Sequence, residues 1–122
     1  MNLRFGLVAL AVAALGCSGG SSSTAPNTNT DTFGGSATAT SVDVNMPQVV
    51  FNPNHIDIAQ NGTVRFVFTN VAHDVRFNGV AGAPADILAT SNVTVTRTFS
   101  TKGTFPVVCT LHSNMTATIV VH

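Results

Sequence analysis

The sequence predicts an all-β fold, a sandwich of two sheets over residues 41–122. In this part of the chain, short runs rich in Val, Ile, Thr and Phe alternate with turn residues, a pattern typical of strands joined by tight loops. Apolar and polar side chains alternate in TVRFVF (63–68) and VTVTRTF (93–99), as they do in strands with one buried face. No segment keeps a helical period, so helices are not expected to build the core.

The composition is that of one small globular domain. The chain has 122 residues, of which 44% are hydrophobic and 8% are charged, which is enough for one core and not for two. Five Lys and Arg residues balance five Asp residues, and Glu is absent. Because no basic stripe can form, we expect no nucleic-acid partner.

The first 16 residues are expected to be an export signal. One Arg precedes an apolar run that ends at Gly16, and the run is shorter than the roughly 20 residues of a membrane span. Its end, AALGC, resembles the lipobox of bacterial lipoproteins. That likeness implies that Cys17 is lipidated and anchors the protein to a membrane; cleavage without lipidation is the alternative. The expected location is the periplasm or the cell surface.

Residues 17–40 are expected to be a disordered linker between the anchor and the domain. They are rich in Ser, Thr, Gly and Asn and offer almost nothing to bury. A disulfide between Cys17 and Cys109 is the alternative use of two cysteines in an exported protein. It would leave the His and Met beside Cys109 without a role, so we expect Cys109 to serve another purpose.

The expected strands follow one another with turn signals between them. NPN (52–54), QNG (60–62) and TKG (101–103) mark turns. The segment 78–91 has no strand pattern and is expected to form an irregular crossover with at most one turn of helix. The expected strands cover residues 41–44, 48–51, 55–59, 63–68, 74–77, 92–99, 104–108 and 116–122.

Three sulfur and imidazole donors lie close together between the last two expected strands. Cys109, His112 and Met115 recur at intervals of three residues. On a straight strand such side chains diverge, so a tight loop must bring them together. Thiolate, imidazole and thioether are the donors that copper selects. His73, at the entry of an earlier strand, is expected to supply the fourth donor.

These residues resemble the ligands of the cupredoxins, the blue copper proteins of the plastocyanin and amicyanin type. The resemblance covers residues 41–122 and follows the family's order of His, Gly, aromatic residue, Cys, His and Met, matched here by His73, Gly103, Phe105, Cys109, His112 and Met115. It implies a Greek-key β-sandwich in which His73, Cys109 and His112 hold one copper ion, with Met115 as a weak axial ligand. It also implies a monomer that transfers single electrons between redox partner proteins.

Each donor also has an ordinary interpretation. Taken singly, Cys109 could be a small buried hydrophobe, Met115 a core filler and His73 a strand-end histidine. We expect His55 and His122 to take no part in metal binding. A module that buffers or delivers copper is the alternative function, and a metal-free adhesion sandwich is the third. An enzyme is not expected, because residues 108–110 are Val-Cys-Thr, where a multicopper oxidase carries His-Cys-His.

One residue departs from the family pattern beside the first histidine. Asp74 follows His73, where the family usually carries an Asn that braces the copper loop. An Asp can accept hydrogen bonds from the loop backbone or from Thr110. Its negative charge would favour Cu(II), so the sequence predicts a lowered reduction potential.

The resemblance also implies a route for electrons. In the family, the imidazole that matches His112 reaches the surface through an apolar patch. The candidates for that patch here are Leu111, Pro106 and Met46.

Overall fold

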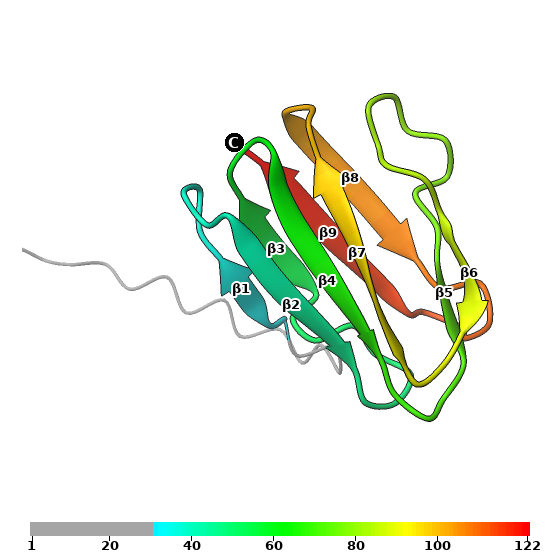
Figure 1. Cartoon of the computed structure of the whole chain (residues 1–122). Helices are drawn as coiled ribbons and strands as arrows, with labels where there is room; N and C mark the ends of the chain where they lie inside the picture. Colours follow the sequence, from blue (N-terminus) through cyan, green and yellow to red (C-terminus); the bar gives the residue numbers. More distant parts are fainter. Residues whose placement is uncertain (1–30) are drawn as a thin grey trace, which may run out of the picture.

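The computed structural model describes residues 31–122 and shows two sheets packed face to face (Figure 1). One sheet has the order β1-β3-β9-β8 and the other β2-β4-β7, while β5 and β6 form a separate two-stranded ribbon. None of the described residues forms a helix long and apolar enough to cross a membrane. The strands are β1 Phe33–Gly35, β2 Ser41–Met46, β3 His55–Ile58, β4 Gly62–Phe68, β5 His73–Val75, β6 Ile87–Thr90, β7 Val93–Phe99, β8 Gly103–Val108 and β9 Thr116–Val121.

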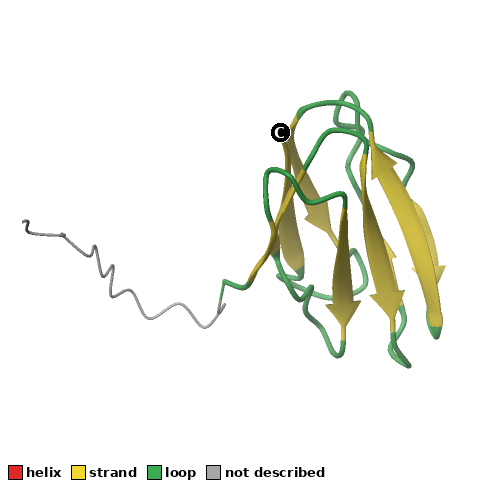
Figure 2. Ribbon diagram, turned by 60° about the vertical axis from the view of Figure 1, so that its left-hand side comes forward, coloured by secondary structure: helices red, strands yellow, loops and turns green. Residues whose placement is uncertain are grey.

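The chain crosses repeatedly between the two sheets. It passes from β2 to β3 in the other sheet and back to β4, so that β2 and β4 pair in parallel, as β3 and β9 also do. Two antiparallel pairs complete the sheets, β4 with β7 and β8 with β9. The turned view in Figure 2 shows the strands spanning the domain and the loops gathered at its two ends. The all-β sandwich predicted from the sequence is confirmed.

Alternating apolar side chains fill the space between the sheets. Every second residue of β2 points inward, and Val44 and Met46 are fully buried. A row of aromatic rings crosses the core, with centroids 5.8 Å apart for Phe77 and Phe99 and 5.6 Å apart for Phe99 and Phe105. Such tilted and edge contacts add to the stabilisation from burial. Because Phe77 lies just after β5, the row ties the β5–β6 ribbon to both sheets.

Two local expectations from the sequence are wrong. Residues 48–51 form no strand but part of the loop between β2 and β3, where Val49 and Val50 are about half exposed. The segment 78–91 is irregular over residues 78–86, as expected, but it then forms the strand β6, which the sequence pattern did not predict. Leu88 of β6 is 71% exposed, so this strand lacks the alternation that reveals a half-buried strand. It forms because its backbone pairs with β5.

The ordered domain begins before the expected boundary at residue 41. Phe33–Gly35, placed in the disordered linker by composition, forms β1 and pairs in parallel with β3. A Cβ atom on Gly34 would overlap Pro53, and one on Gly35 would overlap the backbone of Asp57. The two glycines therefore permit close packing here rather than flexibility. The expected export segment 1–16, Cys17 and the expected linker up to residue 30 lie outside the described residues.

Removal of β1 should destabilise the domain. A chain that starts at residue 41 loses the β1–β3 pairing and the hydrogen bond from His55 N to Thr32 O, 2.9 Å long. We expect its free energy of unfolding to be about 3–5 kcal/mol below that of a chain that starts at residue 31, because at least four backbone hydrogen bonds, to the carbonyls of Thr32, Ala39 and Thr40, are lost at about 1 kcal/mol each. Urea unfolding of both metal-free chains measures the difference, and equal values would contradict a structural role for β1.

Candidate metal centre

A tight loop between β8 and β9 carries three of the four predicted donors. The backbone N–H of Cys109 donates to the carbonyl of Met115 at 3.0 Å and closes the loop at its base. Asn114 adopts a left-handed conformation with φ 62°, which Asn tolerates better than most residues. The loop therefore reverses the chain within seven residues, as the spacing of the donors requires.

Two imidazoles and a thiol converge at this loop. His73, the first residue of β5, is fully buried, and its Nδ1 lies 3.9 Å from the Sγ of Cys109. The Nδ1 of His112 lies 3.6 Å from the same sulfur. The three donor atoms lie within 4.8 Å of one another. The structure thus brings together residues that are 36 positions apart in the chain.

The spacing of these atoms fits a metal ion at their centre. With metal bonds of about 2.05 Å to nitrogen and 2.3 Å to sulfur, a trigonal arrangement separates the nitrogen from the sulfur by about 3.8 Å. The observed separations of 3.9 and 3.6 Å differ from this value by only one or two tenths of an ångström. Two His and one Cys in a trigonal plane form the donor set of a blue copper site. The residues present therefore fit one copper ion.

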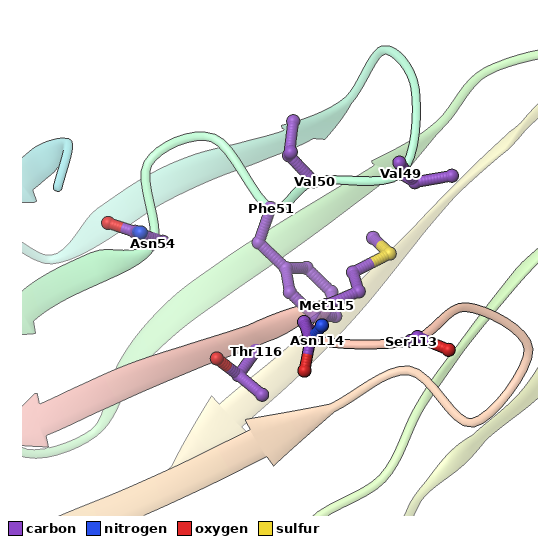
Figure 3. A pocket seen from close by; sticks show the side chains of 8 residues that line it. All are labelled: Val49, Val50, Phe51, Asn54, Ser113, Asn114, Met115 and Thr116. Atoms are coloured by element: carbon purple, nitrogen blue, oxygen red, sulfur yellow. The ribbon is translucent and has the colours of Figure 1, made fainter. Parts of the chain in front are cut away.

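Met115 is the last residue of the ligand loop before β9. Its side chain is 2% exposed and lies against Phe51 (Figure 3). In this close-up the thioether extends toward the loop that carries Val49 and Val50. A shallow pocket separates this loop from the ligand loop; it is lined by Val49, Val50, Phe51, Asn54, Ser113, Asn114, Met115 and Thr116.

His73 is held in the neutral form that metal binding needs. Burial lowers the pKa of His73, and the neighbouring His112 lowers it further, while Asp74 acts in the opposite direction. A neutral imidazole can coordinate a metal without first losing a proton. Metal-bound histidines generally donate a hydrogen bond from the ring nitrogen that does not bind the metal. In His73 that nitrogen would be Nε2, which is buried and has no hydrogen-bond partner among the described residues.

Asp74 braces the ligand loop, as its position in the sequence suggested. Its Oδ1 accepts from the backbone N–H of Thr110 at 2.6 Å, and its Oδ2 accepts from the Thr110 hydroxyl at 2.5 Å. Burial would raise the pKa of Asp74, but the hydrogen bonds from Thr110 and Arg76 outweigh it and lower the pKa to about 2. The carboxylate is therefore charged at neutral pH although it is 1% exposed.

Sequence reasoning missed the part played by Arg76. Its Nε donates to Oδ2 of Asp74 at 2.8 Å, and its Nη1 lies 3.5 Å from Oδ2 of Asp86. The available signal was the spacing: residues i and i+2 of a strand share a face, so Arg76 can reach the side chain of Asp74. Asp86 came from the segment without a clear pattern, so nothing in the sequence placed it here.

The other expected residues lie in different places. The ring of His55 lies against that of Phe33 in a tilted arrangement, with centroids 5.0 Å apart, and His122 Nε2 lies 2.6 Å from Oδ1 of Asp57. Neither belongs to the donor cluster. Of the residues proposed for an apolar patch, Leu111 is 48% exposed beside His112. Met46 is fully buried in the core and is a wrong assignment.

Comparison with known proteins identifies the class of fold. No protein-family model matches the chain, and no curated protein sequence matches it. Among solved structures, an amicyanin variant in its reduced Cu(I) form is 22% identical with a TM-score of 0.61, over 73% of this chain and 91% of that one. A variant fern plastocyanin is 25% identical with a TM-score of 0.58, over 66% of this chain and 99% of that one.

A copper-containing nitrite reductase from Thermus scotoductus SA-01 is also similar. It is 25% identical with a TM-score of 0.57, over 66% of this chain. The match spans only 22% of the reductase chain. The fold of this protein is that of the cupredoxins, and its His, Cys and His cluster with Met115 at the end of the loop is a site that could bind one copper ion. The resemblance drawn from the sequence is confirmed at this level.

The charge of Asp74 should make the metal-free protein sensitive to acid. Because the pKa of Asp74 is about 2 in the folded chain and 3.8 ordinarily, its carboxylate stabilises the fold at higher pH. This contribution, roughly 2 kcal/mol, declines from about pH 4 and is lost as the pH falls through about 2. Urea unfolding of the wild type and of Asp74→Asn at successive pH values should show the gap between them closing over this range.

An exposed carboxylate provides the control for this acid sensitivity. Asp43 lies in a surface ion pair with Arg65, in which both side chains are about half exposed. The gap between the wild type and Asp43→Asn should stay small at every pH, because exposed pairs contribute little. A gap for Asp74→Asn that did not change between pH 5 and pH 2 would contradict the expectation.

Proposed function

We propose that this protein is a type 1 copper protein that carries single electrons between redox partners in the cell envelope. The observation that supports the proposal most strongly is that the donor atoms of His73, Cys109 and His112 lie at separations that suit a shared metal ion. In this proposal His73, Cys109 and His112 would hold the ion, and Met115 would supply a further, weaker donor. Copper would supply the chemistry, a one-electron change between Cu(I) and Cu(II).

The scaffold supports electron transfer because it restrains the donors. His73 and Cys109 are buried, at 0% and 4% exposure. Cys109 is fixed by the hydrogen bond to Met115 O, and Thr110 is fixed by Asp74. Donor atoms that move little between oxidation states lower the reorganisation that electron transfer requires. The sandwich would therefore keep the positions of the donor atoms nearly the same in both oxidation states of the ion.

The end of the sandwich that carries the ligand loop suits contact with a partner. His112 is partly exposed there, and Leu111 next to it is 48% exposed. The segments that connect strands at this end contain no Asp, Glu, Lys or Arg; they are residues 46–54, 69–73, 90–92 and 110–116. One charged residue, Asp31 before β1, lies at the same end. Contact at this end would depend on shape and apolar area, with little electrostatic steering.

Two other roles are less well supported. Buffering or delivery of copper is the alternative, but a site whose thiol is 4% exposed gives a metal acceptor little access. Catalysis, as in the nitrite reductase that shares the fold, is a third role, but residues 31–122 contain a single cluster of three metal-binding side chains. The expected export segment and Cys17 support a location at a membrane outside the cytoplasm.

Loading with copper should produce the spectrum of a blue copper site. Residues 31–122 with one equivalent of Cu(II) should show an intense visible thiolate-to-copper band and narrow copper hyperfine splitting in EPR. Ascorbate should bleach the band reversibly. Cys109→Ser should lose the band completely, because the thiolate is the source of the charge-transfer transition.

Matched variants separate the ligands from other residues. His112→Ala should lose the blue band, whereas His122→Ala, which removes a histidine outside the cluster, should keep it. Met115→Leu should keep the band with a raised potential, since an axial donor to Cu(II) is lost. A colourless tetragonal Cu(II) spectrum, or binding that does not depend on Cys109, would contradict the proposal.

Electron exchange between two copies should depend little on salt. If this end, whose connecting segments are uncharged, is the contact surface, the self-exchange rate constant, measured by NMR line broadening, should change less than about twofold between roughly 0.02 and 0.5 M salt. Leu111→Lys should slow exchange at low salt and recover at high salt, because two like charges then meet. Leu111→Gln is the neutral control. Strong salt dependence in the wild type would contradict use of this end.

A further inference from the structure

Arg76 contacts both flanks of the ligand loop. Its backbone pairs with Val108, the residue before Cys109, through hydrogen bonds of 2.9 Å from Arg76 N and 3.1 Å from Val108 N. Its side chain reaches Thr110, the residue after Cys109, through the carboxylate of Asp74. Arg76 thus restrains both sequence neighbours of Cys109, Val108 directly and Thr110 through Asp74.

The guanidinium of Arg76 is itself held in place from a third direction. Its Nη1 lies 3.5 Å from Oδ2 of Asp86, just before β6. The other oxygen of Asp86 accepts from the backbone N–H of Phe77 at 2.8 Å. Arg76 is therefore fixed between two carboxylates, and its side chain is 30% exposed. This arrangement joins the β5–β6 ribbon to the ligand loop.

The hydrogen bonds at Asp74 explain why an amide would not serve here. Three donors meet its two oxygens: the Thr110 N–H at Oδ1, and the Thr110 hydroxyl and Arg76 Nε at Oδ2. An Asn side chain has one acceptor oxygen and one donor NH₂. In one orientation its NH₂ would face Arg76 Nε, and in the other it would face the Thr110 N–H. Either choice leaves two donors in contact.

We propose that Arg76 is a positioning residue for the metal centre, which acts through Asp74 to hold Thr110 and thereby the thiol of Cys109. The inference rests on the proposed copper function for its effect on the metal, but its effect on the loop is independent of metal. Asp74 and Arg76 form one unit: the arginine requires a carboxylate at position 74, and the carboxylate requires the arginine to offset its charge.

This pairing changes the expectation for the reduction potential. An unpaired carboxylate beside His73 would favour Cu(II), as the sequence alone predicted. Arg76 places a positive charge 2.8 Å from that carboxylate and offsets it. Loss of Arg76 should therefore lower the potential, loss of the Asp74 charge should raise it, and loss of both should return it close to the wild-type value.

The first experiment tests the loop without metal. Amide hydrogen exchange of Thr110 is measured by NMR in the metal-free full chain, in Asp74→Asn, in Arg76→Met and in the double variant. Exchange should be at least about tenfold faster in each single variant, because the bonds at Thr110 weaken when either partner is lost. In the double variant, the introduced amide can turn its oxygen to Thr110 without opposing a guanidinium, so protection should be largely restored.

The second experiment measures the potential of the copper-loaded chains. Each single variant should shift the equilibrium constant for reduction by at least about threefold, which is about 28 mV for one electron. The two shifts should have opposite signs, and the double variant should lie near the wild type. A purely structural role would shift the potential of both single variants in the same direction or leave it unchanged.

The surface pair of Asp43 and Arg65 provides a matched control. It joins the same residue types at 3.2 Å on β2 and β4, with about half of each side chain exposed. The corresponding cycle, Asp43→Asn, Arg65→Met and both, should change neither Thr110 exchange nor the potential. It removes the same charges without touching the loop.

The two experiments distinguish failure of this inference from failure of the proposed function. Unchanged Thr110 exchange in Arg76→Met would overturn the inference, whatever the copper chemistry. Restored protection in the double variant, together with no blue copper site, would support the positioning role and contradict the proposed function. Faster exchange in the double variant than in either single variant would show independent packing effects and would also overturn the inference.

Discussion

The arrangement of the site depends on one backbone hydrogen bond, from Cys109 N to Met115 O. It closes the ligand loop at the end of the β8–β9 hairpin, whose register the sheet fixes. Because the loop is closed at its base, His112 is returned to within 3.6 Å of the thiol. The bridge between Arg76 and Val108 then brings β5, with His73, to the same place. One sheet and the β5–β6 ribbon therefore meet at this loop.

Two buried polar side chains set the energetic constraints on this end of the domain. Among the described residues, His73 and Asp74 are the only buried polar or charged side chains. A buried charge is costly unless it is paired and hydrogen-bonded, and Asp74 has three donors on its two oxygens. His73 avoids the cost by staying neutral, since burial lowers its pKa. The cost of burying a charge is thus offset by hydrogen bonds at Asp74 and avoided by loss of the charge at His73.

Sequence reasoning succeeded where a pattern reports burial or donor chemistry. TVRFVF matches β4 because its inward residues, such as Val64 and Phe66, alternate with outward ones. The spacing of Cys109, His112 and Met115 indicated a loop because no strand could bring them together. Sequence reasoning failed at β6 and β1. These strands are held by backbone pairing and expose Leu88 and Phe33, so they lack the burial pattern that reveals a strand. Arg76 was missed because its role depends on contacts across three segments.

The direction of β1 determines at which end of the sandwich the preceding chain joins the domain. Since β1 runs parallel to β3, the chain enters from the same end that carries the ligand loop, and Asp31 lines a pocket with Val108 and Thr116, the residues that flank the loop. The C terminus follows β9 to the opposite end (Figure 1). A tether before residue 31, as proposed above, would therefore join the domain at the end that carries the ligand loop, and the loop would lie closer to the point of attachment than the C terminus does.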